Sequence, residues 1–387
     1  MMKRFLMNTI AAAAAALAVS ACIYPFEPEA QGEGGRMVIE GDILIGEETI
    51  VNLSYTAPIG GALQREAPEA QVWVKDENGN IYGGLYRETT EDNIAVYAID
   101  TKEADPSLKY SLHVRNLTDL KTYETELLDV HKGAEIDSLT YILDAERGLF
   151  NVGISVHTTG ESYFRWTYSE DWEFHSDYGS YLVYDTMTRE MRTRTYEEDI
   201  YTCWGHDTSS EIIIFSTESQ TEDRFVDLEF RTIENTDRKI SSLYYIEVQI
   251  EAMSKDAYDY WNNVKTNSEY SGSLFSPNPS EMVGNIRCVE DPNELVIGYI
   301  NAAMRSTKSM FYDNTFIAFF KRKYPAADTK KDLQTRYWAT TASQGAWIPL
   351  YYPDPMDTSN ATWGLAICTD CRRMGGTKTR PPHFPLP

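Results

Sequence analysis

The chain has 387 residues, and its 59 acidic residues outnumber its 35 basic ones, which gives a formal net charge of −24. This acidic surplus argues against a nucleic-acid partner, because binding to phosphates needs a basic surface. An apolar fraction of 42% is enough to bury sizeable cores, and the length favours two or three domains.

The N-terminus has the order of a bacterial lipoprotein signal. Lys3 and Arg4 precede an apolar, alanine-rich run over 10–19. This run is well short of the roughly 20 residues that span a bilayer, so we interpret it as the apolar region of a signal peptide. Two small residues then precede Cys22, as in a lipobox. We therefore expect a signal peptide over 1–21 and a lipid on Cys22, whose acyl chains contribute about 0.8 kcal/mol per buried CH₂.

The next segments predict a tether and a first β domain. Residues 22–35 are rich in Pro, Gly and Glu, which is typical of a flexible linker. Apolar and polar residues alternate over 51–55, and an Asn-Gly turn predicts a hairpin over 72–82. About seven such segments fit within 36–131. This spacing predicts an immunoglobulin-like β-sandwich.

Residues 132–387 predict a larger antiparallel β domain with one helix. The helix is expected near 254–270, with Ser254 as its N-cap. The last forty residues are rich in Pro, Trp and Tyr, and we expect an irregular segment there. The fold class is therefore mainly β. Strands with one buried and one wet face are expected where apolar residues alternate, at 150–156, 226–230 and 246–250.

Four cysteines follow Cys22, namely Cys203, Cys288, Cys368 and Cys371. An even number in an exported chain favours disulfides, for which three connectivities exist. We expect the pairs Cys203–Cys288 and Cys368–Cys371. Zinc binding and redox activity are the alternatives for the CxxC pair. A four-cysteine zinc site normally has two close cysteine pairs, and only one close pair is present here. A thioredoxin-like CxxC motif lies at the start of a helix, and the residues after Cys371 do not predict one.

No motif of a nucleophile, a phosphate loop, a dinucleotide site or a zinc protease is found in the sequence. We therefore predict a non-enzymatic protein without catalytic residues, cofactor or metal. Asp76 begins a pattern like that of a calcium loop, but Arg87 stands where the loop needs a bidentate Glu, so a hairpin turn is favoured. A hydrolase that uses the carboxylates of Glu170 and Asp171, or those at 197–199, is a third hypothesis.

Aromatic residues are concentrated in two stretches. Exposed aromatics would suit sugar stacking or a protein interface. In the first stretch Trp166 and Trp172 share a predicted sheet face with Phe164, which favours core packing. In the second stretch, which begins at Trp338, core packing is the alternative to contact with a partner or ligand. The candidate contact residues there are Trp347, Tyr351, Tyr352 and Trp363.

Several motifs resemble those of an outer-membrane lipoprotein family of Bacteroidota. They are Val-Ile-Glu-Gly at 38–41, Gly-Ser-Leu-Phe-Ser-Pro-Asn-Pro-Ser at 272–280, Val-Gly-Asn-Ile at 283–286, Val-Ile-Gly-Tyr-Ile at 296–300 and Cys-Thr-Asp-Cys-Arg with Gly-Gly-Thr within 368–377. Two departures are Ile300, where the family more often has Phe, and His383-Phe384 in place of a Phe-Trp pair. The motif glycines and prolines are expected to be structural, at tight turns and close backbone approaches.

The resemblance implies a protein of unknown function, encoded beside TonB-dependent receptors and lipid-anchored on the periplasmic or surface face of the outer membrane. An accessory role in nutrient uptake, with a receptor as partner and a glycan or peptide as cargo, is the leading hypothesis. The alternative is a surface adhesin or glycan-binding protein.

Overall fold

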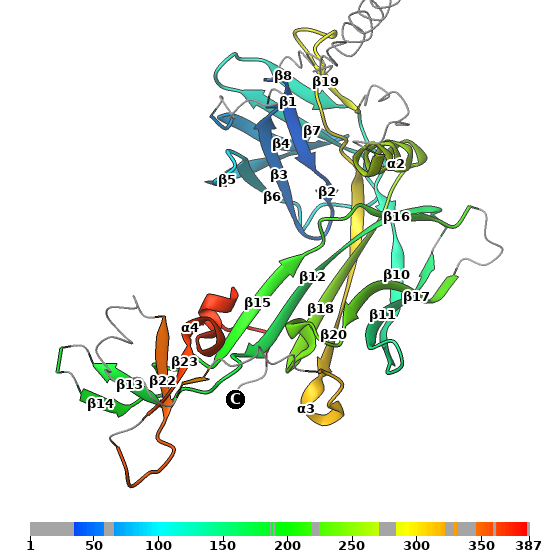
Figure 1. The fold of residues 1–387 in the computed structure, drawn as a ribbon. Coiled ribbons are helices and arrows are strands. Elements are labelled where there is room, and N and C mark those ends of the chain that lie inside the picture. Colours follow the sequence, from blue (N-terminus) through cyan, green and yellow to red (C-terminus); the bar gives the residue numbers. More distant parts are fainter. Residues whose placement is uncertain are drawn as a thin grey trace, which may run out of the picture.

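A computed structural model describes residues 35–57, 66–158, 160–185, 187–188, 190–218, 224–270, 284–321, 329–330, 346–358 and 361–384. The protein is mainly β and contains one long helix. Figure 1 shows a β-sandwich at one end, a long central sheet, and a small unit at the other end. Cys22, the signal segment and the motif at 272–280 lie outside the described residues.

The N-terminal sandwich is built on one continuous path of eight strands. Its buried core includes Ile39, Leu53, Val74, Val114 and Tyr123, none of them more than 1% exposed. The last strand on the path, β19 (Ile286–Cys288), comes from much later in the chain and pairs with β8 (Thr122–Thr125). In spatial order the strands are β1 (Met37–Gly41), β3 (Glu48–Tyr55), β6 (Ala95–Asp100), β5 (Ile81–Thr89), β4 (Ala70–Asp76), β7 (Tyr110–Asn116), β8 (Thr122–Thr125) and β19 (Ile286–Cys288).

The hairpin predicted over 72–82 is confirmed by β4 and β5. The side chain of Asp76 accepts hydrogen bonds of 2.8 Å from the backbone N–H and 2.7 Å from the side-chain amide of Asn80. Gly79 has a φ of +91°, a conformation that glycine adopts without strain. Asp76 thus closes a turn, as expected.

The central sandwich packs two sheets face to face. Apolar residues of both sheets form its core, with Phe150, Ile154, Phe164, Ile246 and Ile250 fully buried. The larger sheet has β15 (Thr202–Thr208), β12 (Tyr163–His175), β18 (Leu243–Ala252), β20 (Ala302–Asp313) and β2 (Ile43–Leu44), with β16 (Ile213–Ser216) beside β12 and β9 (His131–Lys132) beside β20. The smaller sheet has β10 (Ala134–Asp144), β11 (Leu149–Thr158) and β17 (Arg224–Glu234).

The alternation predicted at 246–250 is confirmed. At 150–156 the predicted apolar face is buried, but Gly153 and Ser155 on the other face are buried as well. The alternation predicted at 226–230 is wrong. Val226 is 63% exposed and Leu228 is 37% exposed. Asp227 has a φ of +49°. The pairing of β17 with β11 shifts register twice, once between Phe225 and Leu228, across Asp227, and once between Glu229 and Arg231. A β-bulge therefore turns these two apolar side chains outward.

The opposite face of the larger sheet is polar. Thr167, Thr307 and Ser309 on this face are exposed. At one end of the face the ring of His383 stacks on that of Tyr245, with centroids 3.9 Å apart. We call this surface the open face. Its rows, read from strand to strand, are Arg165–Glu251–Arg305, Thr167–Gln249–Thr307, Thr208–Ser169–Glu247–Ser309 and His206–Asp171–Tyr245–Phe311.

An ion cluster joins the N-terminal sandwich to the central sheet. Arg165 on β12 pairs with Asp42, which lies between β1 and β2, and donates a 3.1 Å hydrogen bond to Glu251 on β18. Arg305 donates a 2.8 Å bond to the same Glu251. The guanidinium carbon of Arg165 also lies 4.8 Å from the ring centroid of Trp261. The cluster therefore connects the two sandwiches and the long helix.

The predicted helix is confirmed as α2 (Lys255–Tyr270). The Ser254 hydroxyl accepts a 3.1 Å hydrogen bond from the Ala257 N–H, as an N-cap does. Ala257 and Tyr260 are buried, and the Tyr260 ring packs on that of Tyr299. Among the described helices, none is long and apolar enough to cross a membrane.

Candidate functional site

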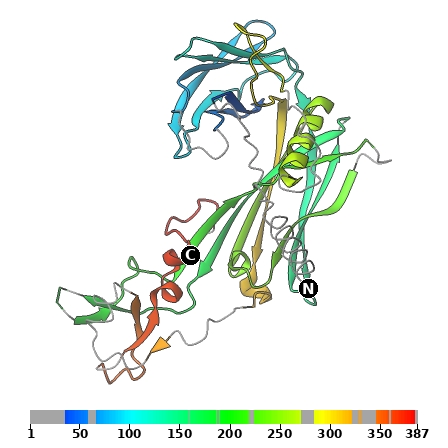
Figure 2. The ribbon, with the colours of Figure 1, turned by 45° about the horizontal axis from the view of Figure 1, so that its top comes forward.

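The small unit at the far end of the molecule is seen in Figure 2. It contains all four predicted contact residues, Trp347, Tyr351, Tyr352 and Trp363. Of the C-terminal segment, predicted to be irregular, residues 347–351, 362–369 and 371–374 form short strands and helical turns of this unit, while residues 352–358 and 375–384 lie outside any helix or strand named here. We call this small unit the distal subdomain. It comprises β13 (Leu182–Asp185), β14 (Glu190–Thr193), β21 (Thr329–Lys330), β22 (Trp347–Tyr351), β23 (Thr362–Leu365), α4 (Ala366–Thr369) and the 3₁₀ helix η3 (Cys371–Met374).

The four predicted contact residues have different environments. Trp363 is only 1% exposed and belongs to the distal core, so core packing, the alternative given above, holds for this residue. Trp347 and Tyr352 are half-buried against this core. Tyr351, by contrast, is 47% exposed. The predicted core packing of Phe164 and Trp166 in the other aromatic stretch is confirmed.

The disulfide of the described structure joins Cys203 on β15 to Cys371 at the start of η3. Both predicted pairings, Cys203–Cys288 and Cys368–Cys371, are therefore wrong. Cys288 is a buried thiol in the N-terminal sandwich, and Cys368 is a buried residue of α4. The disulfide fixes the distal subdomain to the edge strand of the central sheet.

The glycines of the C-terminal motif have structural roles, as predicted. Gly375 ends η3 with a φ of +88°. A Cβ atom on Gly376 would lie 2.5 Å from the Cβ of Cys203 and 2.7 Å from the ring of Phe174. Only glycine lets the chain pass this close to the disulfide.

The distal subdomain exposes several large apolar side chains. Two tyrosines have no covering neighbours over much of their rings, since Tyr181 is 68% and Tyr196 is 82% exposed. Exposed aromatic residues and methionines are enriched in protein interfaces. We call this set the distal apolar set. Its members are Tyr181, Met187, Tyr196, Tyr351, Met356 and Ile367.

The backbone that carries Tyr181 is held firmly. Its N–H donates a 2.7 Å hydrogen bond to the carbonyl of Leu350, and its carbonyl accepts a 2.8 Å bond from the Arg194 N–H. The Arg194 guanidinium also donates to the carbonyls of Leu182 and Glu198, at 3.1 Å each. Burial lowers the pKa of Arg194, although neighbouring carboxylates oppose this. Exposed rings on a fixed backbone lose little entropy on binding.

A second ion pair braces the same loop. Both terminal nitrogens of Arg192 donate to the carboxylate of Glu198, at 2.6 and 2.5 Å. The bonds from Arg192 and from the Thr195 N–H hold the pKa of Glu198 at about 2, so this carboxylate is ionised at neutral pH. Glu198, one of the carboxylates considered for hydrolysis, thus has a bracing contact.

Glu170 and Asp171 point to opposite faces of β12. Glu170 is buried in the central core, where Arg231 and Lys239 pair with it. Asp171 lies on the open face, 2.8 Å from Nδ1 of His206. The two carboxylates therefore do not converge on one cleft. Within the described residues, no group of three or more His, Cys, Asp or Glu side chains is placed to hold a metal ion.

Fold and surface together define a multi-sheet β protein with an exposed apolar set on its distal subdomain. Residues 23–309 match the model of the DUF4249 family, described as a domain of unknown function, and the chain belongs to this family. No curated protein matches the sequence. Among solved structures, a DUF4785 family protein from Legionella pneumophila is similar at 9% identity and a TM-score of 0.19, over 55% of this chain and 52% of that one. The chain thus matches about half the length of that structure.

Proposed function

We propose that this protein is a non-enzymatic lipoprotein of the outer membrane of Bacteroidota, anchored through Cys22. We further propose that it is an accessory component of a TonB-dependent nutrient-uptake system. In this role it binds the receptor through the distal subdomain. The lipobox order around Cys22 and the motif resemblance support the anchor and the setting.

The observation that carries the proposal is the distal apolar set. Exposed aromatic and methionine side chains on one small subdomain are what a protein-binding surface would supply. Tyr181, Tyr196 and Met356 are each more than two-thirds exposed. A partner that covers them would gain about 25 cal/mol per Å² of apolar surface removed from water.

The position of the set also supports the proposal. The predicted tether is followed directly by β1, which belongs to the N-terminal sandwich. The distal subdomain lies at the other end of the molecule, beyond the central sheet (Figure 1). A protein tethered by its N-terminus would hold this subdomain away from its own anchor, where it can reach a neighbouring receptor.

Co-purification tests the proposal. A tagged full chain, solubilised in mild detergent from its native host, is expected to retain a TonB-dependent receptor that mass spectrometry identifies. The double variant Tyr181→Ser with Tyr196→Ser should lose most of this receptor. The matched control, Leu85→Ser with Ile142→Ser, removes two exposed apolar residues elsewhere and should retain it. Isolation of the wild type as a monomer, or equal capture by both variants, would contradict the proposal.

Glycan binding is a second candidate, favoured by the open face. Its rows of Thr, Ser, Gln and Glu side chains offer hydroxyl, amide and carboxylate groups, which hydrogen-bond sugars well. Phe311 beside them is 43% exposed and could stack on a sugar ring. A glycan array tests this candidate, with binding expected to be lost in Phe311→Ala and Gln249→Ala but kept in Trp347→Ala. Loss in Trp347→Ala alone would place sugar contact on the distal subdomain instead.

A further inference from the structure

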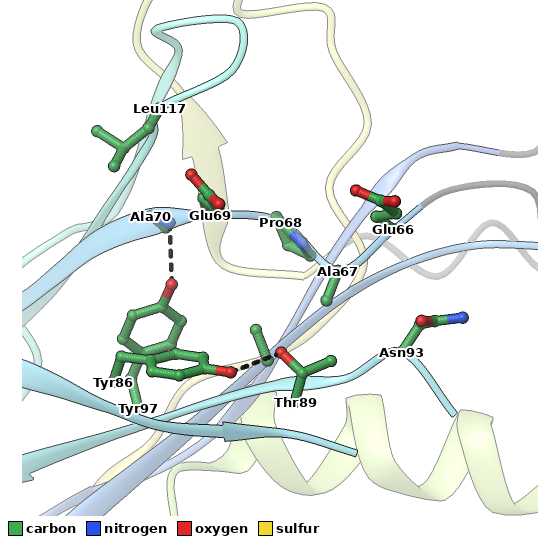
Figure 3. A pocket seen from close by; sticks show the side chains of 11 residues that line it. Glu66, Ala67, Pro68, Glu69, Ala70, Tyr86, Thr89, Asn93, Tyr97 and Leu117 are labelled. Carbon is green, nitrogen blue, oxygen red and sulfur yellow. Dashed lines mark hydrogen bonds between the residues drawn. The ribbon is translucent and has the colours of Figure 1, made fainter. Parts of the chain in front are cut away.

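A cavity of about 650 Å³ lies in the N-terminal sandwich, far from the distal apolar set. The segment before β4 passes over the β5–β6 hairpin, and the cavity lies between them (Figure 3). This volume is within the range of small-molecule sites. Its apolar walls are Ala67, Pro68, Ala95 and Leu117, together with the rings of Tyr86 and Tyr97.

The two tyrosine rings form adjoining walls of the cavity. Their centroids are 5.8 Å apart and their planes meet at 70°. Tyr97 is 5% exposed, and its hydroxyl accepts a 2.9 Å hydrogen bond from the Ala70 N–H. The Tyr86 hydroxyl lies 2.9 Å from the hydroxyl of Thr89. Tyr86 itself is 57% exposed. The Tyr97 ring is thus fixed in the core, and the more exposed Tyr86 ring lies beside it (Figure 3).

The charge at the cavity is negative. Glu66 and Glu69 line it, and the described part of its lining includes no lysine, arginine or histidine. Among the residues that the structure describes, neither carboxylate has a cationic partner within ion-pair distance. Burial raises the pKa of Tyr97, and the charge of Glu69 adds to this rise, so the phenol stays neutral.

We propose that this cavity binds a small organic cation, an ammonium group carried on a compact apolar body. The faces of the two tyrosine rings attract a cation through their quadrupoles, and rings at an angle can contact it from two sides. Glu66 and Glu69 add Coulomb attraction at the rim. Apolar walls then accommodate the methyl or methylene groups. A free quaternary ammonium compound and a lysine side chain of a peptide share this chemistry.

The inference is independent of receptor binding, so the two can fail separately. Its test is calorimetric titration of the full chain with choline and with 3,3-dimethyl-1-butanol, which has the same shape without the charge. Choline is expected to bind at least about five-fold more tightly, the ratio that a cation–π contact of ordinary strength gives. The tripeptide Gly-Lys-Gly serves as a third probe. Whichever cation binds more tightly identifies the source of the ammonium group.

Variants separate ring and charge contributions. Tyr86→Leu should weaken choline binding about five-fold, and the matched control Tyr181→Leu on the distal subdomain should leave it unchanged. Glu69→Gln should weaken it about three-fold at low salt. Its control is Glu77→Gln, which removes the same charge from the β4–β5 turn.

Three results would overturn the proposal. They are equal affinity for choline and its neutral isostere, no heat from either cationic probe, and wild-type affinity in both Tyr86→Leu and Glu69→Gln. Circular dichroism should be used to check that each variant is folded. Because Tyr86 and Glu69 are exposed, neither substitution removes core packing.

Discussion

The carboxylate of Glu170 on β12 and the guanidinium of Arg231 on β17 meet across the core of the central sandwich. Arg231 donates hydrogen bonds of 2.8 and 3.0 Å to the two carboxylate oxygens. Lys239 adds a bond of 2.5 Å and the Tyr244 hydroxyl one of 2.6 Å. The Glu170 side chain is 1% exposed, so both of its carboxylate oxygens need hydrogen-bond donors within the protein.

Glu170→Gln should therefore destabilise the protein by about 3 kcal/mol at neutral pH, because it leaves the Arg231 guanidinium without its buried counter-charge and Lys239 with Asp207 alone. Urea unfolding measures the difference. The control Glu229→Gln changes an exposed carboxylate on β17 and should stay within about 0.5 kcal/mol of the wild type.

The same contact should make stability depend on pH. Burial by itself would raise the pKa of Glu170, but the bonds from Arg231, Lys239 and Tyr244 outweigh burial and lower it. The stabilisation is thus fully present above the unfolded glutamate pKa of about 4.3, and is lost as pH falls through the lower folded value. The gap between wild type and Glu170→Gln should be constant from pH 7 to about pH 5 and shrink below that. An undiminished gap under strongly acidic conditions would show that packing, not charge, causes it.

Gly298 is predicted to tolerate no side chain. Its φ is +132°, and a Cβ atom there would lie 1.9 Å from the carbonyl oxygen of Ile39. We expect Gly298→Ala to destabilise the fold by about 3 kcal/mol or more, from strain and displacement of β1. Gly83→Ala is the control, since a Cβ there meets nothing within 4 Å. Equal melting temperatures for the two variants would contradict this account.

Those glycines illustrate what could be predicted from the sequence. The motif residues Gly284 and Gly298 were expected to mark close backbone approaches, and a Cβ on Gly284 would indeed lie 1.7 Å from the Gly298 carbonyl oxygen. Strand alternation at 246–250 was likewise correct, because burial of one sheet face imposes a local period of two. Features that one strand or one turn determines are therefore recoverable from sequence.

Features that depend on the path of the chain were not recoverable. Cys203 pairs with Cys371 because the distal subdomain returns η3 to β15, whereas Cys288 leaves with β19 for the N-terminal sandwich. The sequence left Trp363 open between contact with a partner and core packing, and only the fold shows that the distal core forms around it. The exposure of Tyr181 was missed because a lone tyrosine beside a short hairpin gives no periodic signal. Each depends on contacts between distant segments.

Arg165 is predicted to hold the two sandwiches together. Arg165→Met removes the guanidinium shared by Asp42 and Glu251, and leaves both buried carboxylates with fewer counter-charges. The expected loss is about 3–5 kcal/mol, with faster proteolysis around residues 42–47. Arg287→Met is the matched control, because its ion pair with Glu124 is exposed and should contribute at most about 1 kcal/mol. Unchanged proteolysis in Arg165→Met would show that other contacts join the sandwiches.

The disulfide should stabilise the protein and keep the distal apolar set in place. Cys203 and Cys371 are 168 residues apart in sequence, and closing so long a loop restricts the unfolded chain. Cys203→Ser should therefore cost about 3–5 kcal/mol. Cys288→Ser, which replaces a buried thiol in the other sandwich, should cost about 1 kcal/mol. Non-reducing peptide mapping should find Cys203 linked to Cys371, and linkage to Cys288 would contradict the structure. If the distal subdomain binds a receptor, Cys203→Ser should also reduce receptor capture, because the exposed rings lose the fixed backbone that carries them.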